Sequence, residues 1–241
     1  MDTQTSSQKV KALVFDVFGT VVDWRSSIAR EVRELARAKG IRINPQRFAD
    51  AWRAGYKPAM DRVRRGELPW MNIDRLHRLI LDDLVRKFHL QALSETEVQH
   101  LNRAWHRLKP WPDSVRGLKR LKKRFVISTL SNGNVALLTN MAKHAGLPWD
   151  CVISAELFHH YKPDREAYLG AAELLGIRPD EVMLVAAHKD DLHAAKNAGL
   201  HTAFVTRPRE FGRSSKNDLS PEPSFDFNAT DFLDLADKLE A

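Results

Sequence analysis

The sequence contains almost no cysteine and no long hydrophobic run. Cys151 is the single cysteine among 241 residues, which excludes an internal disulfide framework and is typical of a reducing cytosol. It begins the short apolar segment CVIS, where we interpret it as a small core residue rather than a nucleophile. No apolar run approaches the ~20 residues that a membrane-spanning helix needs, and residues 1–9 lack the apolar centre of a secretory signal. We therefore expect a cytoplasmic protein that does not associate with membranes.

The sequence also lacks a recognisable nucleic-acid-binding motif, although its formal net charge is +7. The basic residues are dispersed, and the densest run, Lys119 to Arg124, has a leucine in its middle and precedes a predicted strand. This pattern is typical of a solvated helix face. We therefore expect no nucleic-acid partner, and a positive field that favours a small anionic substrate.

Residues 22–110 show helical spacing of their apolar side chains. Ser26 or Ser27 is expected to cap the first helix, and the dipeptide Asn44-Pro45 to open the second. Pro58 is expected to interrupt this middle part of the segment. The helices predicted from the pattern are 26–40, one beginning at 44, 72–89 and 94–108. An all-helical segment inserted after a first strand suggests a cap.

In the rest of the chain, short apolar runs alternate with helical segments. Strands are predicted at 12–17, 125–130, 151–154, 181–187 and 201–205, the last of these being the final strand, and helices at 114–123, 135–145, 165–175 and 192–198. Residues 213–225 are rich in serine and proline and are predicted to form a surface loop. The alternating order indicates an α/β fold with a doubly wound parallel sheet. We predict a core formed by residues 1–21 and 111–241, and a helical cap formed by residues 22–110.

Polar residues follow four of the predicted strands or their connections. Asp16 interrupts the first apolar run, Gly19 permits a tight turn, and Thr20 adds a hydroxyl group. The other three clusters are Ser131-Asn132, Lys162 and His188 to Asp191. The carboxyl ends of parallel strands meet at one crevice, so we predict an active site there. Asp16 could be a nucleophile or could cap its own turn, and the residue types leave both interpretations open.

In this order the four clusters resemble the motifs of the haloacid dehalogenase superfamily. The first motif matches residues 16–20 (DVFGT), the second Ser131-Asn132-Gly133, the third Lys162-Pro163, and the fourth Asp191. The similarity covers nearly the whole chain, including the helical insertion after the first strand. It implies a Rossmann-like core in which Asp16 is a covalent nucleophile.

The residue two positions after Asp16 distinguishes the branches of this superfamily. Its phosphatases carry a second aspartate there, which protonates the leaving alcohol, whereas this chain has Phe18. A halide leaves as a stable anion and needs no proton, so Phe18 favours carbon–halogen cleavage. Trp52-Arg53, Ser131-Asn132 and the pair Lys162 and Tyr168 are similar to the 2-haloacid dehalogenase branch.

The resemblance implies a role for each matched residue in the first step. Asp16, oriented by Thr20, attacks the α-carbon of the substrate and forms an ester. Arg53, delivered by the cap, and Asn132 hold the departing halide. Lys162 keeps Asp16 ionised, because a nearby cation lowers the pKa of a carboxyl group.

The resemblance also indicates how the substrate is held. Its carboxylate is expected to bind Ser131, Lys162 and backbone N–H groups of Val17 and Phe18, beside Tyr168. Phe18 and the cap residues Trp52 and Trp70 are expected to exclude water from the pocket.

Hydrolysis of the ester involves the fourth cluster, and here the chain departs from better-known members of the branch. Those members have serine and asparagine where this chain has Ala186 and His188. Asp191 is the candidate base or water holder. His188 could position or deprotonate the water, bind halide when protonated, or only support its neighbours, and the sequence leaves these roles open.

The pair Asp190-Asp191 could also suggest Mg²⁺, as in the phosphatases. A metal would compete with Lys162 and attract the attacking carboxylate, and the dehalogenase branch is metal-free, so we expect no metal and no cofactor. The predicted reaction is hydrolysis of short 2-haloalkanoic acids, the (S) isomer with inversion, to 2-hydroxy acids. A Mg²⁺-dependent phosphatase for a small phosphate ester and a non-catalytic binding protein are the alternatives. The sequence leaves the oligomeric state open; the resemblance suggests a homodimer, since helical-cap members of the family are commonly dimers.

Overall fold

A six-stranded, fully parallel sheet forms the centre of the protein. The computed structural model describes residues 9–212 and 218–241, so the predictions for residues 1–8 and 213–217 lie outside the described residues. The strands are ordered β5-β4-β1-β6-β7-β8. Their bounds are β1 Ala12–Phe15, β4 Val126–Ser131, β5 Cys151–Ser154, β6 Val182–Ala186, β7 His201–Val205 and β8 Phe227–Ala229. The predicted α/β fold is confirmed.

Strand β1 lies between β4 and β6, where the order of the sheet changes direction. Ala12 is in register with Val126 on one side and with Val182 on the other. All four residues of β1 are buried, as expected for a strand covered on both faces. The crevice beyond the carboxyl end of such a strand is the usual binding site of doubly wound folds. Asp16 is the first residue after β1 and therefore lies at this point.

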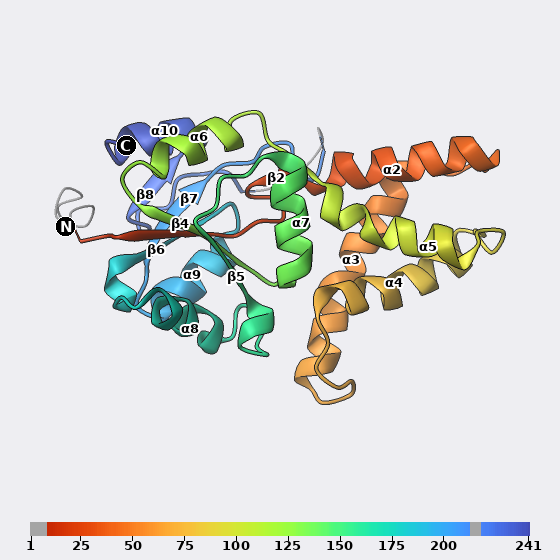
Figure 1. The fold of residues 1–241 in the computed structure, drawn as a ribbon, viewed down its shortest axis with the longest axis horizontal. Coiled ribbons are helices and arrows are strands. Elements are labelled where there is room, and N and C mark those ends of the chain that lie inside the picture. Colours follow the sequence, from red (N-terminus) through yellow and green to blue (C-terminus); the bar gives the residue numbers. More distant parts are fainter. Residues whose placement is uncertain (1–8, 213–217) are drawn as a thin grey trace.

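Helices cover both faces of the sheet (Figure 1). The figure shows α6 and α10 on one side and α8 and α9 on the other. The bounds are α6 Ser114–Leu121, α7 Val135–Ala145, α8 Arg165–Leu175, α9 Lys189–Asn197 and α10 Phe232–Lys238. Helix α9 begins three residues earlier than predicted, so Asp191 lies in its first turn.

The expectation that residues 201–205 form the final strand is wrong. Strand β8 follows and pairs in parallel with β7, Ala203 opposite Phe227. Three residues carry no periodicity of their own, so only pairing with an existing sheet edge makes this segment a strand. Helix α10 then packs on α6, with Phe232 close to Gly117.

Four helices between β1 and α6 lie to one side of the sheet, in the segment where the cap is predicted (Figure 1). They are α2 Trp24–Lys39, α3 Pro45–Arg64, α4 Ile73–Lys87 and α5 Glu95–Asn102, followed by the 3₁₀ helix η1 Arg103–Arg107. At the junction with the core, the two-residue strands β2 (Val22–Asp23) and β3 (Lys109–Pro110) pair antiparallel. The domain boundaries, which are residues 1–21 and 111–241 for the core and 22–110 for the cap, stay a prediction.

Two details of the predicted cap helices are wrong. Helix α2 starts before the serines, because Asp23 is its N-cap and accepts a 2.9 Å hydrogen bond from the Ser26 backbone N–H. Helix α3 continues through Pro58. Pro58 and Ala54, whose carbonyl loses its helical partner, are both exposed, so water can solvate that carbonyl.

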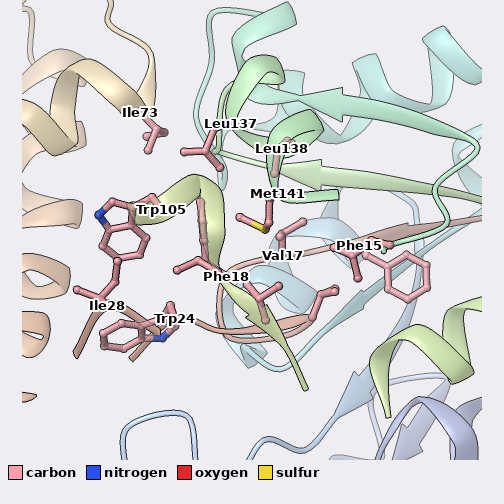
Figure 2. Close-up of a cluster of buried hydrophobic side chains, with 14 of the residues drawn as sticks. Phe15, Val17, Phe18, Trp24, Ile28, Ile73, Trp105, Leu137, Leu138 and Met141 are labelled. Carbon is pink, nitrogen blue, oxygen red and sulfur yellow. The ribbon is translucent and has the colours of Figure 1, made fainter. Parts of the chain in front are cut away.

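Phe18 joins the apolar interiors of cap and core. Its side chain is buried, and its ring centroid lies 5.7 Å from that of Trp105 in η1. Figure 2 shows the surrounding side chains of this single cluster, which are Trp24, Ile28, Ile73 and Trp105 from the cap and Leu137, Leu138 and Met141 from α7. The cap therefore packs against the core through this shared apolar cluster. No helix within 9–212 or 218–241 combines the length and apolarity needed to cross a bilayer.

Candidate active site

A cavity of about 230 Å³ lies between α3 of the cap and the carboxyl edge of the sheet. Its walls hold most of the predicted site residues. Those lining it are Asp16, Phe18, Arg53, Ser131, Asn132, Lys162, His188 and Asp191. Three others do not line it: Thr20 and Tyr168 donate hydrogen bonds to Asp16 and Asp191, and the Val17 side chain belongs to the apolar core (Figure 2).

Asp16 is held by three side chains. Thr20 donates from Oγ1 to Oδ2 at 2.7 Å, and its own oxygen accepts from the Ala187 backbone N–H at 2.9 Å. Lys162 Nζ lies 3.1 Å from Oδ1, and His188 Nδ1 lies 3.0 Å from Oδ2. Both carboxylate oxygens are therefore fixed, in a residue that is 8% exposed.

The surroundings of Asp16 keep it ionised. Burial by itself raises the pKa of this carboxyl group, because a charge is costly away from water. The positive charge of Lys162, together with the hydrogen bonds from His188 and Thr20, outweighs burial and holds the pKa well below its usual range. Asp16 is thus a buried, fixed and charged carboxylate, as a nucleophile has to be.

Lys162 bridges Asp16 and Asp191. Its Nζ is 2.5 Å from Asp191 Oδ2, and the Tyr168 hydroxyl donates to Asp191 Oδ1 at 2.6 Å. The two carboxylates outweigh burial and raise the pKa of Lys162. Burial and the nearby charge of Asp16 raise the pKa of Asp191, against the effects of Lys162 and Tyr168. Asp191 is therefore a stronger base than an exposed aspartate.

His188 lies between two carboxylates. Its Nδ1 faces Asp16, and its Nε2 lies 3.0 Å from Oε1 of Glu210. Glu210 is 2% exposed and also accepts a hydrogen bond from Trp24 Nε1 at 3.1 Å. Burial lowers the pKa of the imidazole, but Asp16 and Glu210 together raise it to about 10. His188 is thus an imidazolium at neutral pH, which argues against a role as base in the resting enzyme.

Gly19 makes room for this arrangement. A Cβ atom at position 19 would lie 2.1 Å from Oε1 of Glu210, and the residue has φ +90°, which favours glycine. Glu210 is a contact that sequence reasoning missed. It comes from a turn five residues after the predicted strand 201–205, and no pattern around it indicates its partner.

Arg53 brings an uncompensated cation to the cavity. Among the described residues, its buried Nη1 has no hydrogen-bond partner. The guanidinium carbon lies 4.7 Å from the ring centroid of Tyr56 and 5.7 Å from that of Trp24. A buried donor without a partner is costly, so this geometry fits an anion that enters the cavity.

Ser131 is the last residue of strand β4 and Asn132 follows it, and both line the cavity. Asn132 Oδ1 accepts from the Lys162 backbone N–H at 2.6 Å, and Nδ2 contacts the Lys162 carbonyl oxygen at 3.3 Å and Met60 Sδ at 3.6 Å. Ser131 Oγ accepts from the Gly133 backbone N–H at 3.2 Å. The second motif therefore also fixes the position of the third.

The apolar part of the wall differs from the expectation. Trp52 and Trp70 do not line the cavity; Trp52 packs inside the cap, where its Nε1 donates to the His77 carbonyl oxygen. The aromatic residues that do line it are Phe18, Tyr56 and Phe211. Tyr56 was missed, although its place three residues after Arg53 on a helix puts both on one face.

The site offers a poor fit to Mg²⁺. Divalent magnesium binds through carboxylate oxygens and water in octahedral geometry. Here the ammonium group of Lys162 lies between the two carboxylates, Asp16 and Asp191, that a phosphatase would present to the metal. Within the described residues, no group of three or more His, Cys, Asp or Glu is arranged to hold a metal.

Comparison with known proteins agrees with this geometry. The family model described as haloacid dehalogenase-like hydrolase matches residues 10–199. The structure is similar to that of the defluorinating L-2-haloacid dehalogenase Rha0230, with a TM-score of 0.93 and 47% identity over 96% of both chains. A structure of the L-2-haloacid dehalogenase from Xanthobacter autotrophicus with chloropropionic acid covalently bound has a TM-score of 0.77 and 25% identity, covering 96% of this chain and 99% of that one.

A curated relative adds to this similarity. The (S)-2-haloacid dehalogenase 4A of Burkholderia cepacia is 28% identical over 204 residues, covering 82% of this chain and 84% of that protein. The family model spans well over half of the chain. The chain therefore belongs to the haloacid dehalogenase-like hydrolases, within their L-2-haloacid dehalogenase branch.

Proposed function

We propose that the protein hydrolyses short (S)-2-haloalkanoic acids to 2-hydroxy acids, with inversion, through an ester on Asp16. One observation carries this proposal. A buried, ionised Asp16 shares a cavity with Arg53, whose buried Nη1 has no hydrogen-bond partner among the described residues, and Phe18 stands where a phosphatase needs an acid. Both similar structures and the curated relative are named as 2-haloacid dehalogenases, one of them with a covalently bound acid.

The first step is a displacement at carbon. One oxygen of Asp16 attacks the α-carbon, the carbon–halogen bond breaks, and the halide leaves with the bonding electrons toward Arg53 and Asn132. No proton is transferred, so Phe18 is compatible with the chemistry. Donors already in place around the developing halide charge lower the barrier, since they need no reorganisation.

The substrate carboxylate has a cationic environment. Lys162 and His188 lie on the core side of the cavity, and Lys57 and Arg64 lie on the cap side. Ser131 and the backbone N–H groups of residues 17 and 18 are the proposed contacts that fix the acid. The positive charges of these residues attract an anion, so an anionic substrate is favoured over a neutral one.

The second step is hydrolysis of the Asp16 ester. Water adds to the carbonyl carbon of the Asp16 ester, and Asp191 accepts a proton from this water, in keeping with the raised pKa of Asp191. When the tetrahedral intermediate collapses, the departing alkoxide needs a proton, and the imidazolium of His188 lies against Asp16 to supply it. Asp16 then returns its own proton to His188, and Asp191 releases one to solvent. The sum is one alcohol, one halide and one proton per water consumed.

Halide release in the presence of EDTA tests the proposal. The protein is incubated with each enantiomer of 2-chloropropanoate, and chloride and 2-hydroxypropanoate are measured. We expect chloride from the (S) enantiomer only, with no effect of EDTA. Phosphate release from small phosphate esters that requires Mg²⁺, without any chloride, would instead identify a phosphatase.

The covalent step has its own test. In a single turnover in ¹⁸O-labelled water, we expect the label first in the Asp16 carboxylate rather than in the product. Asp16→Asn should remove activity by roughly 10⁴-fold or more while leaving the thermal unfolding transition intact. Label that passes directly into the product would exclude the ester.

The homodimer and the cytoplasmic location are proposals that rest on the resemblance and on the single cysteine. Light scattering coupled to size exclusion tests the first of these. A monomer at all accessible concentrations would contradict it.

A further inference from the structure

Tyr56 shares one face of α3 with Arg53 and lines the same cavity. The Arg53 guanidinium carbon lies 4.7 Å from its ring centroid, and the ring packs edge-on against Phe18 at 6.4 Å. The residue is 7% exposed. The ring is therefore held between the cation that receives the halide and the phenylalanine of the first motif.

The hydroxyl of Tyr56 is used differently from those of the other two tyrosines. The Tyr161 hydroxyl donates to the Met71 carbonyl oxygen, and the Tyr168 hydroxyl donates to Asp191. The Tyr56 side chain instead lines the cavity, whose wall also includes Asn132. Tyr56 thus shares the cavity with Arg53 and Asn132, the two residues assigned to the halide.

The protonation state of Tyr56 suits a donor. Burial raises the pKa of its hydroxyl to about 12, against the opposing effects of Arg53 and Lys162. The group therefore keeps its proton at neutral pH, where Asp16 is ionised. A neutral hydroxyl can donate to an anion beside Arg53 without adding a charge to the buried site.

We propose that the Tyr56 hydroxyl donates a hydrogen bond to the departing halide, as a third donor beside Arg53 and Asn132, and that this donor determines how well the enzyme releases fluoride. The inference rests on the proposed dehalogenation. Fluoride is the smallest halide and concentrates its charge most, so it depends most on hydrogen bonds as the carbon–halogen bond breaks. Bromide spreads its charge over a larger volume and depends on them least.

The test compares halides rather than absolute rates. kcat and KM are measured for fluoroacetate, chloroacetate and bromoacetate, with the wild type and with Tyr56→Phe. We expect the kcat for fluoroacetate to fall by roughly 10²–10³-fold, the loss typical of one oxyanion donor. The loss should be smaller for chloroacetate and smallest for bromoacetate, with KM nearly unchanged. Equal losses for the three acids, no loss, or a wild type that releases chloride but no fluoride would each overturn the inference.

Tyr161→Phe is the matched control. It removes a tyrosine hydroxyl that faces Met71 rather than the cavity, so the ratio of fluoride to bromide release should stay at the wild-type value. A wild type that releases no halide from any of these acids contradicts the proposed function itself. In that case halide binding is read from the thermal unfolding midpoint in sodium fluoride. Fluoride should raise it for the wild type but not for Tyr56→Phe, and an equal response of both would overturn the role of Tyr56.

Discussion

Lys162 places its ammonium nitrogen 3.1 Å from Oδ1 of Asp16, in a site where both side chains are almost fully buried. Neither charge would be stable there alone, because an isolated buried ion loses its hydration. The same ammonium group also contacts Asp191, so two carboxylates share one cation. The same contact that stabilises the pair keeps the proposed nucleophile ionised.

Lys162→Met should therefore change the pH dependence as well as the rate. Without the ammonium group, burial and the charge of Asp191 raise the pKa of Asp16, so the acid limb of the kcat profile should move to higher pH. We expect a loss of about 10²-fold or more at neutral pH. Lys87→Met is the control, since that lysine is exposed at the end of α4 and does not line the cavity. An unchanged acid limb in Lys162→Met would contradict the assigned role.

Arg53→Ala should lower halide release by roughly 10²–10³-fold, because a buried cation facing the departing halide is removed. Arg53→Lys should restore only part of the rate, since an ammonium cannot reproduce the planar guanidinium fork. Arg62→Ala on the same helix is the control, because Arg62 is half exposed and pairs with Glu67. Equal activity of the variants at positions 53 and 62 would exclude Arg53 as the halide site.

The imidazolium of His188 predicts an alkaline limit. Its pKa in the folded protein, about 10, lies above the unfolded value of 6.5. Its contribution to stability is therefore fully present below pH 6.5 and is lost as the pH rises through 10. Activity should fall over the same alkaline range. In Glu210→Gln one carboxylate beside His188 is removed. The alkaline fall in kcat and the alkaline loss of thermal stability should therefore both move to lower pH. Coincident profiles for wild type and variant would rule out this pairing.

Gly19→Ala should damage both stability and activity. The added Cβ meets the carboxylate of Glu210 and forces a left-handed backbone on alanine, so we expect a cost above the ~1–3 kcal/mol of the backbone strain alone. Gly146→Ala separates the two causes. It has the same left-handed conformation at φ +67° but open space around its Cβ. It should lower the unfolding midpoint and leave kcat unchanged, and a similar loss of kcat in both variants would refute the clash with Glu210.

Most of the architecture could be predicted from local patterns. Strands β1, β4, β5, β6 and β7 are short apolar runs, and the Ser94 capping box marks the start of α5. Strand β8 could not be predicted, because a three-residue segment becomes a strand only by pairing with β7. The interruption expected at Pro58 does not occur, because the exposed position of this residue removes most of the penalty that proline brings to a helix.

The amino-acid sequence by itself determined the order of the elements, the place of Asp16 at the end of a central strand, and the resemblance that assigns Arg53, Lys162 and Asp191. These properties depend on neighbours in the chain. Only the tertiary structure decided that Glu210 meets His188 and that Tyr56 lines the same cavity as Asn132. The partners in each pair are 22 residues or more apart, so no local periodicity records their contact. Burial strengthens those interactions, since charges and hydroxyl groups interact strongly where water is excluded.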